Sequence, residues 1–185
     1  AFFLAVMHDP EFDPIPQVEQ ELKAFEVAGG EFLVLAADSG REGYDDRPVL
    51  DERGWATLFA NLTRIREVCA ANGVTACLHP HWGTMVQNVD EVVRVLDNST
   101  VGLCLDTGHL TAGGADVVDL VGTYAGRVDI VHAKDVDKAL TDKRVGDFVL
   151  DVQMQPFRFG VVQALPQGAY LPVQVTGTGS VRWDP

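Results

Sequence analysis

Four of the five histidines in this sequence stand at the ends of short apolar runs, together with an aspartate and a lysine. They fall in the segments LHPHWGT (78–84), LDTGH (105–109) and VHAKD (131–135). Imidazole and carboxylate groups suit Mn, Co, Zn or Fe better than they suit an all-oxygen Mg or Ca site. Such a divalent cation acts as a Lewis acid, which polarises a carbonyl and stabilises an enediolate. The three segments therefore predict a metal site, with Mn, Co or Zn favoured and Mg or Fe as alternatives.

The spacing of these residues selects the candidate metal ligands. His79 and His81 are two positions apart, so in an extended chain both side chains share one face, and Pro80 favours that extended geometry. Asp106 stands where a predicted strand turns into its loop, and His132 ends the next strand. His81 and His109 stand at the same strand ends and are candidates too, and from this set we predict His79, Asp106 and His132 as metal ligands.

Other polar residues in the same segments are candidates for substrate contact or proton transfer. We predict His109 and Lys134 as catalytic residues that hold or protonate the substrate, and His8, His81 and Trp82 as substrate-binding residues. His8 would lie at the rim, and the Trp82 indole would offer a stacking surface for a sugar. The alternatives stay open: a structural histidine, a surface ion pair, and an aromatic side chain at the edge of the core.

The order of the elements indicates where these residues meet. Five nearly continuous apolar runs predict parallel strands buried on both faces, at 2–7, 32–37, 74–79, 101–106 and 128–133. Helical periodicity separates them, at 15–28, 55–71, 89–96 and 117–124. Repeated βα units build either a doubly wound sheet or a (β/α)8 TIM barrel, and the lack of a Gly-rich phosphate loop favours the barrel. In a barrel the active site forms at the carboxyl ends of the strands, where the three segments lie.

The length and the termini modify this expectation. The chain has 185 residues and begins at Ala1 within an apolar run, whereas a barrel takes about 250 residues. We therefore expect an incomplete barrel that lacks its first and last strands. Residues 1–142 would form its βα repeats. Residues 143–185 would form an atypical segment of the same domain, with weak strands at 148–153 and 171–176 or, alternatively, a shifted reading frame.

Composition excludes several classes of partner. With 14 Lys+Arg against 27 Asp+Glu, the net charge of −13 argues against nucleic acid, and no apolar run approaches the ~20 residues of a membrane helix. Cys69, Cys77 and Cys104 lie in apolar stretches, where cysteine is a small buried hydrophobe. We expect a reducing, cytoplasmic setting and a small-molecule partner, and a homo-oligomer is left open.

Three longer segments carry a resemblance to a known family. LHPHWGTMVQ (78–87), VGLCLDTGHLTAGGAD (101–116) and RVDIVHAKDVD (127–137) resemble the xylose isomerase-like TIM barrel superfamily of sugar phosphate isomerases and epimerases, within it the inosose dehydratase-like branch. The resemblance implies a divalent metal held by Glu, Asp, His and a second Glu. Asp106 and His132 match the middle pair, and His79 or His81 stands in place of the first Glu. Since no Glu follows Glu91, this chain cannot supply the last ligand.

The resemblance also implies a function. It predicts a metal-dependent isomerase, epimerase or dehydratase that acts on a small sugar or polyol through an enediolate. His109 matches a residue that contacts substrate, or a further metal ligand in the endonuclease IV relatives. An endonuclease IV-like DNA repair enzyme and an inactive partial barrel are the alternatives, and the acidic charge disfavours the first of these.

Overall fold

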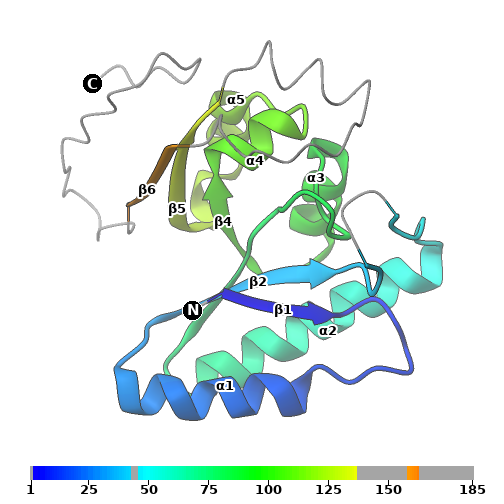
Figure 1. Cartoon of the computed structure of the whole chain (residues 1–185), viewed down its shortest axis with the longest axis vertical. Coiled ribbons are helices and arrows are strands. Elements are labelled where there is room, and N and C mark those ends of the chain that lie inside the picture. Colours follow the sequence, from blue (N-terminus) through cyan, green and yellow to red (C-terminus); the bar gives the residue numbers. More distant parts are fainter. Residues whose placement is uncertain (1, 43–45, 137–157, 163–185) are drawn as a thin grey trace.

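The structure, a computed structural model, describes residues 2–42, 46–136 and 158–162 (Figure 1). The strands are β1 (Phe2–Val6), β2 (Phe32–Asp38), β3 (Thr75–Leu78), β4 (Gly102–Asp106), β5 (Val128–Asp135) and β6 (Arg158–Val162). The helices are α1 (Ile15–Ala28), α2 (Glu52–Ala71), α3 (Val89–Asn98), α4 (Thr107–Ala112) and α5 (Val117–Tyr124), and a 3-10 turn covers Ala125–Arg127. All five predicted strands and all four predicted helices are confirmed.

The order of the strands decides between the two architectures that repeated βα units allow. Strands β1 to β5 lie side by side in sequence order, and each is parallel to the next. A doubly wound sheet would reverse its strand order at a switch point, whereas a barrel adds each strand beside the one before it. The sheet is therefore part of the wall of a (β/α) barrel, as the sequence predicted.

Two features differ from the prediction. Strand β6 was not predicted, and it pairs antiparallel with β5. Helix α4 was not predicted, because its six residues are too few to show a helical period. The strands predicted at 148–153 and 171–176 lie outside the described residues, as does most of the segment 143–185.

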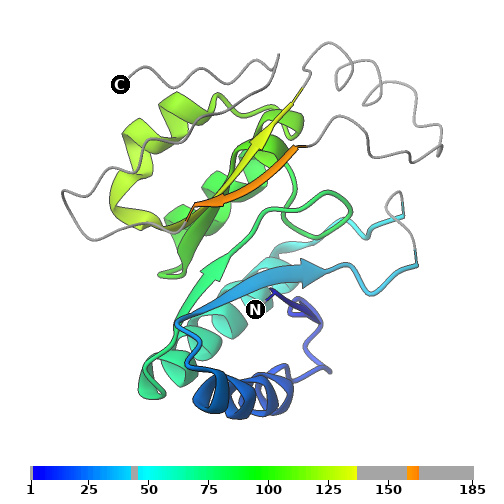
Figure 2. The same cartoon turned by 60° about the vertical axis from the view of Figure 1, so that its left-hand side comes forward.

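The two faces of the sheet carry different side chains because successive residues of a strand point to opposite sides. One face packs against the helices and forms the main core, which includes Phe3, Leu33, Leu35, Leu103 and Leu105 together with Leu58, Leu62 and Ile65 of α2. Figures 1 and 2 show the helices gathered outside the sheet, with α1 and α2 next to each other below β1 and β2. The opposite, inner face carries a small apolar cluster of Val34, Cys77, Cys104 and Ile130.

The inner face becomes polar toward the carboxyl ends of the strands. Two residues beyond Cys104 on β4 stands Asp106, and two beyond Ile130 on β5 stands His132. A step of two residues keeps a side chain on the same face, so the apolar cluster lies beneath a polar layer. No helix among the described residues is long and apolar enough to span a membrane.

A close backbone contact sets the position of α4 against the loop before α3. The carbonyl of Gly113 accepts a hydrogen bond from the Val89 amide (3.1 Å), and a Cβ at Gly113 would collide with the backbone oxygen of Gln87. Only glycine allows the end of α4 to approach this loop so closely.

We expect Gly113→Ala to lower the free energy of unfolding by about 2 kcal/mol, because a backbone atom cannot move aside as a flexible side chain would. The matched control is Gly122→Ala in α5, where a Cβ would meet nothing within 4 Å. That substitution should raise stability by about 0.5–1 kcal/mol through helix propensity. Urea unfolding monitored by circular dichroism measures both values, and equal effects of the two substitutions would contradict the packing argument.

Candidate functional site

The carboxylate of Asp106 lies at the centre of the polar layer, at the end of β4 and fully buried. Its Oδ2 is 2.6 Å from Lys134 Nζ, 3.0 Å from His79 Nε2 and 3.7 Å from His132 Nδ1. Its Oδ1 accepts a hydrogen bond from the backbone N–H of His109 (2.8 Å). The residue after β3, two side chains of β5 and a backbone N–H in the first turn of α4 therefore meet at one carboxylate on β4.

Asp106 is ionised in this environment. Burial alone would raise the pKa of its carboxyl group, but His132 and His79 beside the carboxylate hold that pKa well below its usual range. A buried carboxylate without partners would be strongly destabilising, whereas one with several hydrogen bonds and a nearby cation is tolerated. The site is therefore built around a negative charge.

His79 presents a nitrogen without a hydrogen-bond partner. Its Nε2 lies 3.0 Å from Asp106 Oδ2 and donates to that ionised carboxylate, so Nδ1 is the nitrogen left for another contact. Nδ1 is buried and has no hydrogen-bond partner among the residues that the structure describes. A buried ring nitrogen without a partner marks a position where a ligand or a cation could bind.

His81 and His109 stand next to each other on the same side of the site. Their ring centroids are 4.1 Å apart, and His81 Nδ1 donates to the Trp82 carbonyl (2.8 Å), so the lone pair of His81 lies on Nε2. Burial lowers the pKa of His81, and burial together with the neighbouring His81 lowers the pKa of His109 to about 3. Both imidazoles are therefore neutral at physiological pH.

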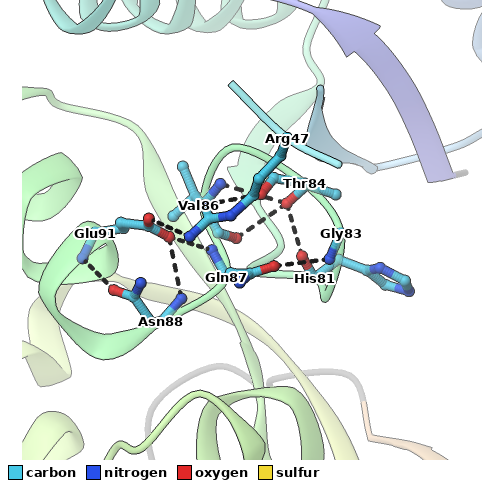
Figure 3. Close-up of polar contacts among 8 residues, drawn as sticks. All are labelled: Arg47, His81, Gly83, Thr84, Val86, Gln87, Asn88 and Glu91. Atoms are coloured by element: carbon cyan, nitrogen blue, oxygen red, sulfur yellow. Dashed lines mark hydrogen bonds and ion pairs between the residues drawn. The ribbon is translucent and has the colours of Figure 1, made fainter. Parts of the chain in front are cut away.

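The loop that follows β3 is held by a polar network (Figure 3). Arg47 forms an ion pair with Glu91 (2.7 Å) and donates to the Thr84 carbonyl (3.3 Å). Thr84 Oγ1 donates to the His81 carbonyl (2.8 Å), and Glu91 Oε2 accepts from the Gln87 amide (2.9 Å). Because the loop backbone is tied at both ends, the histidines that precede it are held at the carboxyl end of the strand.

Two of the predicted residues, His8 and Trp82, are not among the groups around Asp106. His8 lines a hollow of about 650 Å³ at the carboxyl ends of β1 and β2, next to Ser39 and Arg41. Burial lowers the pKa of His8, and its Nδ1 has no hydrogen-bond partner in the described part of the chain. The Trp82 side chain is half-buried. Contact of either residue with substrate stays a prediction.

The cluster fits a divalent cation. His79, Asp106 and His109 each offer a ligand atom within 4.8 Å of the other two, and His79, Cys104 and His132 do the same. Since metal–ligand bonds to nitrogen or oxygen are about 2.0–2.2 Å long, the donors of one ion lie within about 4 Å of each other. Small side-chain movements would bring either set to that spacing. The three predicted ligands are divided between the two sets, and His79 belongs to both.

Sequence reasoning did not assign a role to Thr107 or to the sulfur of Cys104. Thr107 Oγ1 donates to the Lys134 carbonyl (2.6 Å) and accepts from the Lys134 amide (2.8 Å), which ties the ends of β4 and β5 together. The period of two along β4 places Cys104 on the same face as Asp106, so this spacing could have identified Cys104 as a neighbour of the site.

Comparison with known proteins agrees with this architecture. The family described as "Xylose isomerase-like TIM barrel" matches residues 8–166. An inosose dehydratase of Clostridium perfringens is 26% identical over 196 residues, which cover 100% of this chain and 62% of the relative. An inosose dehydratase of Geobacillus kaustophilus is 31% identical over 143 residues, covering 68% of this chain and 46% of the relative. The chain thus spans less than two thirds of the length of these relatives.

Solved structures share the fold at low sequence identity. The probable 3-DHS dehydratase AsbF from Bacillus anthracis has a TM-score of 0.60 at 16% identity, over 74% of this chain and 49% of AsbF. The IolI protein with a bound zinc atom has a TM-score of 0.53 at 19% identity, over 66% of this chain and 44% of IolI. An L-ribulose 3-epimerase has a TM-score of 0.54 at 20% identity, over 63% of this chain and 41% of the epimerase.

We expect Thr107→Val to lower the free energy of unfolding by about 1–3 kcal/mol, because it removes both hydrogen bonds to Lys134 and leaves its backbone groups unsatisfied. The control is Thr57→Val on the exposed side of α2, whose hydroxyl donates within its own helix to the Arg53 carbonyl (2.9 Å). That control should change stability by about 0.5 kcal/mol or less. Thermal and urea unfolding measure the difference, and a neutral Thr107→Val would show that the β4–β5 connection does not depend on the hydroxyl.

Proposed function

Because the chain belongs to the xylose isomerase-like TIM barrel family, we propose that it carries part of the active site of a divalent-metal-dependent sugar or polyol isomerase, epimerase or dehydratase of the inosose dehydratase kind. The observation that carries this proposal is the buried, ionised Asp106 with His79, His132 and Lys134 around it. The net charge of −13 supports a small-molecule substrate over DNA.

The metal would bind between the carboxylate and the imidazoles. Asp106, His79 and His132 are the proposed ligands, and His109 lies within reach of the same position. A divalent cation held there would polarise a substrate carbonyl and stabilise the enediolate formed when the neighbouring carbon loses a proton. Mn, Co and Zn suit this mixed donor set best.

Lys134 and His109 are the proposed catalytic residues. The Lys134 ammonium is held at the polar layer by Asp106 and can donate a hydrogen bond to a substrate oxygen on which negative charge develops. His109 is neutral because of its depressed pKa, so its imidazole can accept a proton or a hydrogen bond from a substrate hydroxyl. His81, Trp82 and His8 would contact the rest of the substrate.

Asp106→Asn tests the metal site. We expect at least a 100-fold loss of Mn²⁺, Co²⁺ or Zn²⁺ affinity by isothermal titration calorimetry, because the variant removes the negative charge. The fold should be kept, since the amide oxygen of the introduced side chain can still accept a hydrogen bond from the His109 amide. Asp97→Asn is the matched control, because this exposed carboxylate lies outside the cluster and bonds to the Tyr124 hydroxyl (2.8 Å).

Activity on inosose provides the second measurement of the same proposal. His132→Ala should reduce turnover in the metal-loaded protein, and Asp97→Asn should not. Wild-type affinity in Asp106→Asn combined with unchanged activity of His132→Ala would rule out the proposed function.

Lys134→Gln tests whether this lysine competes with the metal. Because the Lys134 ammonium already neutralises Asp106 Oδ2, a cation must displace it, and the variant should bind metal about tenfold more tightly. Turnover should fall, since the variant also lacks the charged donor. Metal affinity is measured by competition with a chelating dye, with the exposed Lys23→Gln as the control. Unchanged affinity would mean that Lys134 and the metal occupy different sides of the carboxylate.

A further inference from the structure

Cys104 lies directly beneath the proposed active site. It precedes Asp106 by two residues on β4, so both side chains point to the inner face of the sheet, and the cysteine is fully buried. Its neighbours in the apolar cluster are Val34, Cys77 and Ile130. Cys104 is therefore the member of this cluster whose sulfur also lies beside the histidines of the polar layer.

We infer that Cys104, His79 and His132 form a second, deeper cation position that selects thiophilic divalent metals such as Zn²⁺ or Cd²⁺. The sulfur and one nitrogen from each histidine lie within 4.8 Å of one another. Zinc bonds of about 2.3 Å to sulfur and about 2.0–2.1 Å to nitrogen need donors less than about 4 Å apart. Side-chain movements of about 1 Å would close the site around such an ion.

The electronic character of the donors separates the two positions. One thiolate and two imidazoles are soft to intermediate ligands that favour Zn²⁺ and Cd²⁺. The position at Asp106 has a carboxylate oxygen in place of sulfur, so Mn²⁺ binds there more readily than beside Cys104, whereas Zn²⁺ accepts either donor set. Cd²⁺, which prefers sulfur, therefore favours the deeper position.

The two positions share His79 and compete for their ions. His79 belongs to both groups of possible ligands, and two divalent cations this close together would repel each other. His79 Nδ1 is already buried without a hydrogen-bond partner among the described residues, so ligation would satisfy it. A thiophilic ion in the deeper position therefore withdraws His79 from the upper one, which would make such ions inhibitors of an enzyme activated by Mn²⁺.

Binding of a metal ion in the deeper position releases one proton, from the thiol of Cys104. The S–H bond of Cys104 breaks, a sulfur–metal bond forms, and the proton leaves to solvent. The ion and the thiolate together then carry a single positive charge next to Asp106, whose carboxylate also holds the Lys134 ammonium. No oxidant or reductant takes part.

The experiment is a titration of the reduced full chain with Co²⁺ and with Cd²⁺, followed by absorption spectroscopy. We expect a sulfur-to-metal charge-transfer band in the ultraviolet that saturates at one equivalent. Cys104→Ser should abolish the band, and His132→Ala should reduce metal affinity about tenfold or more. Circular dichroism confirms that each variant is folded.

Two controls separate this position from its surroundings. Cys77→Ser changes the neighbouring buried cysteine, and His109→Gln changes a histidine that is grouped with Asp106 but not with Cys104; both should keep the band. Because the spectrum reports ligation and not turnover, its result is independent of the proposed enzymatic function. A wild-type protein without the band, or a folded Cys104→Ser variant that keeps it, would overturn the inference.

Discussion

The rest of the site depends on the burial of one charge, the carboxylate of Asp106. A fully buried carboxylate is tolerated only where donors and cations surround it, and here they come from different parts of the chain. His79 directly follows β3, and His132 and Lys134 belong to β5. The backbone N–H of His109 in α4 donates to the second carboxylate oxygen. These partners can meet only if β3, β4 and β5 are adjacent and in this register. The order of the strands therefore provides the partners that the buried Asp106 carboxylate needs, and these contacts in turn hold the strands together.

The division of the sheet into two faces explains why one strand can serve both the core and the site. Leu103 and Leu105 of β4 pack beneath the helices, whereas Cys104 and Asp106 point to the inner face. The curvature of the sheet brings inner side chains from non-adjacent strands into contact. Phe2 of β1 lies edge-on against the ring of His79, which directly follows β3, with 5.6 Å between the ring centroids. A barrel wall thus concentrates polar groups that a flat sheet would hold apart.

Much of the fold could be predicted from the sequence because each strand is a nearly continuous apolar run and each long helix shows its period. The position of the polar residues at strand ends also follows from the sequence, since parallel strands bring their carboxyl ends to one edge. The contacts between individual residues of the site cannot be predicted from the sequence in this way. That Lys134 faces Asp106, and that His79 belongs to two groups of possible metal ligands, depends on strand register and side-chain rotamers, which no local pattern encodes. Helix α4 was missed because its start is set by Asp106, whose side chain caps it, and not by apolar periodicity.

Asp106 has two roles in the structure, one for each oxygen of its carboxylate. As the N-cap of α4, Asp106 uses Oδ1 to bind the His109 amide, and this leaves Oδ2 directed to the inner face. The cap fixes the rotamer, so the second oxygen is pre-oriented without any help from a ligand. Lys134 then neutralises that oxygen in the absence of a metal. A cation that enters the site therefore meets an oriented, ionised oxygen, and it has to displace the Lys134 ammonium from that oxygen.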